Sequence, residues 1–317
     1  MDYCKIAEEA LKSYPVKSKS IEFASQNLTT VYKVIGENEN DKYCLRLHIS
    51  RDNKKDDKNS VNSELTWLAA ITADTDITVP VPYKNLHDEY VTEIDDINCS
   101  LTKWLDGENK LDEETSKLLI EVMAKLHKYA STWIIPSGFK RPSFDVNNIT
   151  KVFKPLDNLK TDLVSNDSIK ILKEASQKAI SIINSIEKSQ ATWGLIHNDL
   201  QPQNLLFHDG KICPIDFGAC GFGFFLTDIA TTFHYIPVWY REFFFNEYAK
   251  YMPLPDNYIN LTEALYIAGH VIGLEFPLGL TEDTLEWLPN YINNVANKEA
   301  IHFLNDKSFL FETAFFM

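Results

Sequence analysis

The residue types that could carry out a reaction are concentrated between positions 193 and 230. His197, Asp199 and Asn204 follow the pattern H-x-D-x-x-x-x-N, and Asp216 then begins an Asp-Phe-Gly motif. Phosphoryl transfer needs one carboxylate near the attacking hydroxyl. It also needs an amide and a second carboxylate that bind Mg²⁺, and beyond these groups the protein mainly positions the substrates. In this interpretation Asp199 orients the acceptor hydroxyl, and Asn204 and Asp216 are the metal ligands.

The local context of these residues supports the same chemistry. Apolar runs at 193–196 and 212–215 precede the two motifs, so each acidic group is expected to follow a short strand. Between the motifs, Asp209-Gly210 is a strong two-residue hairpin signal. Such a hairpin would bring Asp216 back beside Asn204. Either motif alone is weak, because a lone Asp-Phe-Gly means little and His-x-Asp is also an ordinary turn sequence.

The segment resembles the aminoglycoside phosphotransferase superfamily, which also contains choline, homoserine and fructosamine kinases. Residues 196–204 read Ile-His-Asn-Asp-Leu-Gln-Pro-Gln-Asn and match that family's catalytic loop better than the protein-kinase loop, which has Arg where Asn198 stands. Asp228-Ile229-Ala230 is similar to a family element that opens a helix. The resemblance gives Asp228 and His197 supporting roles around the catalytic loop.

The resemblance implies a bilobal, protein-kinase-like α+β fold. Residues 1–104 would form the smaller nucleotide-binding lobe, with an antiparallel sheet and a helix, and residues 105–317 the larger, mostly helical lobe that binds the acceptor. It further implies a Mg²⁺-dependent transfer of the γ-phosphoryl group from ATP or GTP to a hydroxyl of a small molecule. Because Asp228 already starts a helix, the chain has no room for the long activation loop of a regulated protein kinase.

Arg46 and Glu64 are the expected polar pair of the first lobe. Most kinase-like folds place a Lys on the strand that here reads Leu-Arg-Leu, and Arg can replace it on phosphate because its planar fork stays charged. Glu64 lies on an amphipathic helix predicted over 60–73 and would hold Arg46 toward the nucleotide. The plain alternatives are an exposed strand arginine and a solvated helix glutamate. Lys33 and Lys42 are weaker candidates for the phosphate contact.

Two further stretches are assigned to the nucleotide by the resemblance. Asn27 and Thr29 lie in the polar turn 25–30, which takes the place of the phosphate-covering loop although it is not glycine-rich. Lys103 and Leu105 follow a strand pair predicted at 90–94 and 98–104, and backbone groups near them would read the base at the hinge between lobes. Gly107 would let the chain turn away there.

Candidates for acceptor binding come from the helical last third of the chain. They are Glu263, His270, Glu275, Asp283 and Glu286, although for each of them a place on a solvated helix face is the favoured explanation. A cationic acceptor would suit acidic groups and the net charge of −14, which by itself indicates only solubility. The same charge argues against nucleic acid or an anionic membrane surface as a partner.

Composition places the protein in the cytoplasm. The five cysteines are scattered without C-x-x-C spacing, which favours neither a disulfide framework nor a zinc site. No signal sequence and no apolar run of about 20 residues is apparent. Two rival functions share the motifs: a stress-response-type protein kinase of the same fold, and a nucleotide-binding regulator without catalytic activity.

Overall fold

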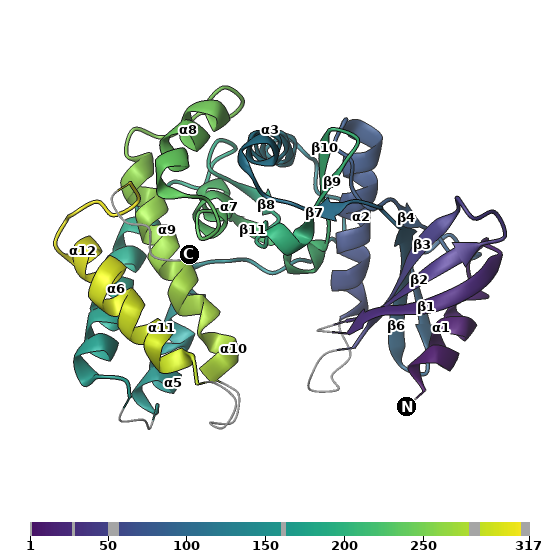
Figure 1. Cartoon of the computed structure of the whole chain (residues 1–317), viewed down its shortest axis with the longest axis horizontal. Helices are drawn as coiled ribbons and strands as arrows, with labels where there is room; N and C mark the ends of the chain where they lie inside the picture. Colours follow the sequence, from purple (N-terminus) through teal and green to yellow (C-terminus); the bar gives the residue numbers. More distant parts are fainter. Residues whose placement is uncertain (1, 27–28, 50–56, 160–162, 279–285, 312–317) are drawn as a thin grey trace. The chain divides into compact units, whose positions relative to one another are not determined.

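The computed structural model describes residues 2–26, 29–49, 57–159, 163–278 and 286–311. The chain divides into two compact units (Figure 1). The first contains Met1–Thr115, Trp133–Arg141 and Gln203–Gly218, and the second contains Ser116–Thr132, Pro142–Pro202 and Ala219–Met317. The predicted lobe boundary after residue 104 stays a prediction.

The first unit is built on an antiparallel sheet. Its strands are β1 (Ser18–Gln26), β2 (Thr30–Gly36), β3 (Lys42–His48), β4 (Pro82–Tyr83), β5 (Val91–Ile94) and β6 (Ile97–Lys103), in the order β1-β2-β3-β6-β4 with β5 also paired to β6. The predicted strand pair around Asp95-Asp96 is confirmed, with Ile94 opposite Ile97. Both aspartates have positive φ, 48° and 63°, as a tight two-residue hairpin turn requires.

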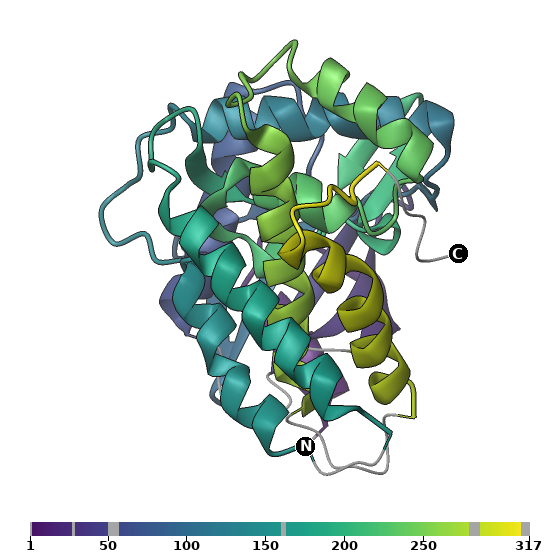
Figure 2. The ribbon, with the colours of Figure 1, turned by 90° about the vertical axis from the view of Figure 1, so that its left-hand side faces the viewer.

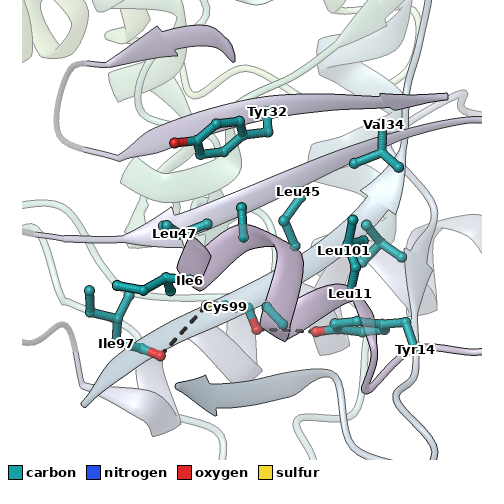
Figure 3. Packing of buried hydrophobic residues seen from close by; sticks show 12 residues of the cluster. Ile6, Leu11, Tyr14, Tyr32, Val34, Leu45, Leu47, Ile97, Cys99 and Leu101 are labelled. Carbon is teal, nitrogen blue, oxygen red and sulfur yellow. Dashed lines mark hydrogen bonds between the residues drawn. The ribbon is translucent and has the colours of Figure 1, made fainter. Parts of the chain in front are cut away.

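Helix α1 (Tyr3–Leu11) covers one face of this sheet and closes its core. Figure 3 shows Ile6 and Leu11 of α1 in one cluster with Leu45, Leu47 and Leu101 of the sheet. Strand β3 alternates between its two faces, so Leu45 and Leu47 are buried in this core while Arg46 points to the other side. Helix α2 (Lys58–Asp74), predicted over 60–73, packs against β4 and β5.

A second, three-stranded sheet belongs to the same unit. It contains β7 (Glu108–Asn109), β9 (Leu205–His208) and β10 (Lys211–Pro214), in the order β10-β9-β7. The predicted hairpin at Asp209-Gly210 is confirmed, because both residues have positive φ and His208 lies opposite Lys211. Gly107 has no room for a side chain, since a Cβ there would lie 2.9 Å from the Cβ of Leu206.

The second unit is mostly helical. Its helices are α3 (Glu113–Ala130, which begins in the first unit), α4 (Val146–Lys151), α5 (Phe153–Asp157), α6 (Asn166–Asn184), α7 (Phe225–Thr232), α8 (Val238–Tyr248), α9 (Tyr258–Gly273), α10 (Glu275–Leu278), α11 (Leu288–Val295) and α12 (Ile301–Leu304), with a π-helical turn at Ala296–Ala300. Figure 2 shows α6 (teal) alongside α9 (light green) and the yellow C-terminal helices, which it contacts. Strands β8 (Trp193–Ile196) and β11 (Gly221–Phe224) form an antiparallel pair.

None of the helices in the described ranges is long and apolar enough to cross a membrane.

Candidate active site

Arg46 is the centre of a charged cluster in the first unit. Its Nη1 donates to Oε1 of Glu64 at 2.6 Å, and its Nη2 donates to Oδ1 of Asp216 at 3.1 Å. The Arg46 and Glu64 side chains are 12% and 3% exposed, whereas that of Asp216 is 54% exposed. The structure therefore brings together three residues that lie far apart in the sequence, one of them open to solvent.

The charge of Arg46 is secured by this cluster. Burial acts to lower the pKa of Arg46, but the attraction of Glu64 and Asp216 outweighs it and raises the pKa above its usual value. Burial has the opposite effect on the neighbouring Cys44 thiol: it raises the pKa of Cys44, so this thiol stays neutral. His48, two residues along β3, has a pKa well below its usual value because of burial and the positive charges of Arg46 and Arg141. Of these three side chains, Arg46 is therefore the one that carries a charge.

The backbone presents Asp216 in an unusual conformation. Its φ is 58°, in the left-handed region that costs a non-glycine residue free energy but that Asp tolerates better than most. The backbone N–H of Ile215, the residue before Asp216, donates to the carbonyl of Asn204 at 2.9 Å. A Cβ at Gly218 would lie 3.2 Å from Oδ1 of Asp216 and 3.3 Å from Nη2 of Arg46. The absence of a side chain at Gly218 therefore avoids a close contact with Asp216 and Arg46.

The donor set at this turn suits Mg²⁺. Within the described parts of the chain, no group of three or more His, Cys, Asp or Glu residues could hold a metal ion. Mg²⁺ prefers oxygen ligands and is usually held by one or two protein groups together with phosphate oxygens. The Asp216 carboxylate and the Asn204 amide match that pattern, and they belong to the same unit.

In the second unit, the buried Asp228 accepts hydrogen bonds from the loop that contains His197 and Asn198, the predicted catalytic loop. The Asp228 side chain is 1% exposed; its Oδ1 accepts from the backbone N–H of Asn198 at 2.6 Å, and its Oδ2 from that of His197 at 2.9 Å. Nε2 of His127 contacts the same Oδ2 at 3.0 Å, and Nδ1 of His127 lies 2.8 Å from the Tyr248 hydroxyl. The expected supporting role of Asp228 is confirmed. Sequence analysis missed His127 as its partner.

Asn198 explains a sequence feature of the loop. Its φ is 64°, a left-handed conformation that glycine adopts freely and asparagine adopts more readily than other residues. This backbone geometry favours Asn over a bulkier residue at the position where the protein-kinase loop has Arg. A large β-branched residue at this position would strain the loop that carries Asp199.

Asp199, the predicted hydroxyl-orienting residue, is held by its neighbours in the second unit. Nε2 of Gln201 donates to its Oδ2 at 3.1 Å, and Oε1 of Gln201 accepts from the Tyr235 hydroxyl at 3.1 Å. Burial first, and then the charge of Asp199, raise the pKa of the Tyr235 hydroxyl. The sequence contained no signal for Tyr235, because it belongs to an aromatic-rich stretch that reads as core.

The remaining residues that were predicted to contact the nucleotide belong to the first unit. Thr29 is in the bend between β1 and β2, while Asn27 lies outside the described residues. Lys103 is exposed, Leu105 is half-buried, and the backbone N–H of Lys103 donates to the carbonyl of Val81 at 2.7 Å. A base-reading role for this stretch stays a prediction. Lys42 pairs with Asp106 at 2.7 Å, and Lys33 lies over the ring of Trp104.

Two of the acceptor candidates are buried. Oε1 of Glu263 accepts from the Ser308 hydroxyl and from the backbone N–H groups of Phe309 and Leu310, so this carboxylate fastens the C-terminal segment. His270 is 2% exposed. Glu275 and Glu286 are exposed, and Asp283 lies outside the described residues.

Comparisons with known proteins identify the family of the chain. A profile described as the phosphotransferase enzyme family matches residues 20–256. Among curated proteins, amicoumacin kinase of Bacillus subtilis (strain 168) is 22% identical over 246 residues, which cover 74% of this chain and 68% of that protein.

Solved structures show the same fold over almost the whole chain. A microcompartment-associated aminopropanol kinase superposes with a TM-score of 0.81 at 21% identity, covering 97% of this chain and 99% of that one. The amicoumacin kinase hAmiN, in complex with AMP-PNP, Ca²⁺ and Ami, has a TM-score of 0.78 at 15% identity, covering 99% and 96%. The predicted kinase-like α+β fold is confirmed.

Proposed function

We propose that this chain, which belongs to the phosphotransferase enzyme family, transfers the γ-phosphoryl group of ATP to a hydroxyl group of a small molecule. The observation that carries the proposal is Arg46 held between Glu64 and Asp216. A buried guanidinium that remains charged can bind phosphate oxygens, and a half-exposed carboxylate beside it can bind the metal ion of the same phosphate. The likeness to a kinase solved with AMP-PNP and Ca²⁺ supports ATP as the donor and a divalent cation as its companion.

Each residue has a stated task in this proposal. Arg46 donates to phosphate oxygens from a fork that Glu64 keeps in place. Asn204 and Asp216 would hold Mg²⁺, which supplies charge neutralisation at the phosphate oxygens when bound. Asp199 accepts a hydrogen bond from the acceptor hydroxyl and receives its proton as the acceptor oxygen bonds to the γ-phosphorus. The bond from the γ-phosphorus to the bridging oxygen breaks, and ADP leaves. Gln201, itself contacted by Tyr235, keeps the Asp199 carboxylate in one orientation.

The acceptor is proposed as a small hydroxylated molecule that carries a positive charge. The net charge of −14 favours a cation over an anion as the approaching molecule. The structural neighbour named for aminopropanol, an amine that bears a hydroxyl, points in the same direction. Thr29, Asn27, Lys103 and Leu105 are retained as proposed nucleotide contacts, and GTP as an alternative donor.

The proposal is tested with a panel of amino alcohols, hydroxylated antibiotics and hydroxy amino acids. ADP release would be measured together with a mass gain of one phosphate on the acceptor. Asp199→Asn should lower kcat by about 10³-fold or more while AMP-PNP affinity stays within a few-fold. Asp209→Asn, at the exposed hairpin tip, is the matched control and should behave as the wild type.

Three outcomes would count against the proposal. Product formation by Asp199→Asn at the wild-type rate removes the assigned role of that carboxylate. Phosphate incorporation into proteins, without reaction of any panel member, favours a protein kinase. AMP-PNP binding without transfer to any acceptor favours a non-catalytic regulator.

A further inference from the structure

The segment Trp133–Arg141 packs onto helix α2 within the first unit. The ring of Trp133 lies 4.7 Å from that of Trp67, which is 2% exposed, and 5.1 Å from that of Phe139. The backbone N–H of Lys140 donates to Oγ of Ser63 at 2.8 Å. These contacts fix the end of the segment against the helix that carries Glu64.

Arg141 then joins that helix to the turn that follows Asp216. Its Nη1 donates to the carbonyl and to Oγ of Ser60, at 3.2 and 3.1 Å. Its Nη2 donates to the carbonyls of Gly218 and Phe217, at 2.6 and 3.4 Å. One guanidinium therefore bridges four oxygens of two elements, a task that the planar fork of arginine performs and a lysine ammonium cannot.

The two elements joined by Arg141 are the ones that hold Arg46. Ser60 lies one helical turn before Glu64, and Phe217 directly follows Asp216. Arg46 links the side chains of Glu64 and Asp216, and Arg141 links the backbones from which these side chains project. The position of one carboxylate relative to the other thus depends on Arg141.

The backbone at Asp216 needs such support. The left-handed region is unfavourable for a non-glycine residue, and such a conformation persists where its surroundings hold it. Arg141 donates hydrogen bonds to the carbonyls of Phe217 and Gly218, the two residues after Asp216, and the Phe217 side chain is 1% exposed. The expected consequence is a carboxylate presented in one direction, which suits a metal ligand.

We propose that Arg141 is a positioning residue for the Mg·ATP part of the site, acting through the backbone of the Asp216 turn rather than by touching the ligand. The inference rests on the proposed function, because it concerns the metal and nucleotide that this function requires. It predicts that loss of Arg141 lowers the Mg²⁺-dependent part of nucleotide affinity more than the part that needs no metal.

The experiment compares Arg141→Met with Lys140→Met in the full chain. Both variants remove one positive charge from adjacent positions, but the Lys140 side chain forms an exposed ion pair with Asp57, with side chains 67% and 41% exposed. AMP-PNP affinity would be measured by calorimetry in Mg²⁺ and in EDTA. The readout is the ratio of the two affinities, because a general loss of folded protein would lower both equally.

We expect Arg141→Met to lower this ratio about tenfold and Lys140→Met to leave it unchanged. A wild-type ratio in folded Arg141→Met overturns the inference. Should that variant show no cooperative thermal transition, Arg141→Lys is judged by the same ratio, and an unchanged ratio there also overturns it. A wild-type protein that binds AMP-PNP in neither condition overturns the proposed function instead.

Discussion

Two aspartates that are close in the sequence, Asp216 of the first unit and Asp228 of the second, are held in opposite ways. The Asp216 side chain is 54% exposed and contacts the side chain of Arg46. The Asp228 side chain is 1% exposed and accepts two backbone N–H groups in addition to its contact with His127. A carboxylate that is saturated by its own protein organises a loop, while one left half-open to solvent can bind a ligand.

The largest effect on stability is expected at Asp228. Asp228→Ala would leave the buried N–H groups of His197 and Asn198 and the ring of His127 without their acceptor. Breaking a buried, hydrogen-bonded carboxylate site of this kind should lower the free energy of unfolding by roughly 3–5 kcal/mol. Urea denaturation measures this loss. A loss below 1 kcal/mol would mean that Asp228 is no more structural than Asp216.

Asp216 should show the converse behaviour. Asp216→Asn keeps the left-handed backbone, which asparagine tolerates, and removes the charge that would bind Mg²⁺. Mg·AMP-PNP affinity should fall about 100-fold, which corresponds to roughly 2.8 kcal/mol, with little change in the apo protein.

A thermal-shift titration with Mg·AMP-PNP would measure this loss of affinity in Asp216→Asn. Asp209→Asn is the matched control, because Asp209 also has a positive φ, of 49°. An undiminished shift in Asp216→Asn would contradict the metal role.

Arg46→Lys is expected to have a smaller effect. Lysine keeps the charge but cannot reach Glu64 and Asp216 at once with a rigid fork. The KM for ATP should rise about tenfold, or roughly 1.4 kcal/mol, with the KM for the acceptor unchanged. Lys42→Ala removes the partly exposed pair with Asp106 and serves as the control. Equal rises in both KM values would argue that the substitution disturbs the fold generally.

The smallest effect is the pH dependence contributed by His48. Its pKa lies well below the usual 6.5 in the folded state, so the unfolded chain binds the proton first as pH falls. Its stabilising contribution is therefore present above pH 6.5 and is lost as pH falls from there toward the folded pKa. The slope cannot exceed about 1.4 kcal/mol per pH unit for one proton.

The comparison variant for this prediction is His48→Gln, whose amide can replace the contact of Nε2 with Oγ of Ser100. The free energy of unfolding of the wild type should fall more steeply than that of His48→Gln between pH 6.5 and 5.5. Parallel curves would mean that His48 titrates alike in both states.

Local sequence signals predicted the elements that depend on near neighbours. Asp209-Gly210 and Asp95-Asp96 supply the positive φ values that their hairpins need, and the alternation of Leu45, Arg46 and Leu47 separates core from polar face. The motif spacing also identified the family. These features rest on backbone preferences and on side-chain periodicity, which a few adjacent residues express by themselves.

Tertiary structure decided which distant groups meet. Arg46 and Asp216 are separated by 170 positions, and Arg141 and Gly218 by 77, so no local pattern links them. Arg141 and His127 belong to none of the motifs that the sequence analysis identified. Their roles follow from packing, because only the folded chain sets which carbonyl or carboxylate lies within reach of each donor.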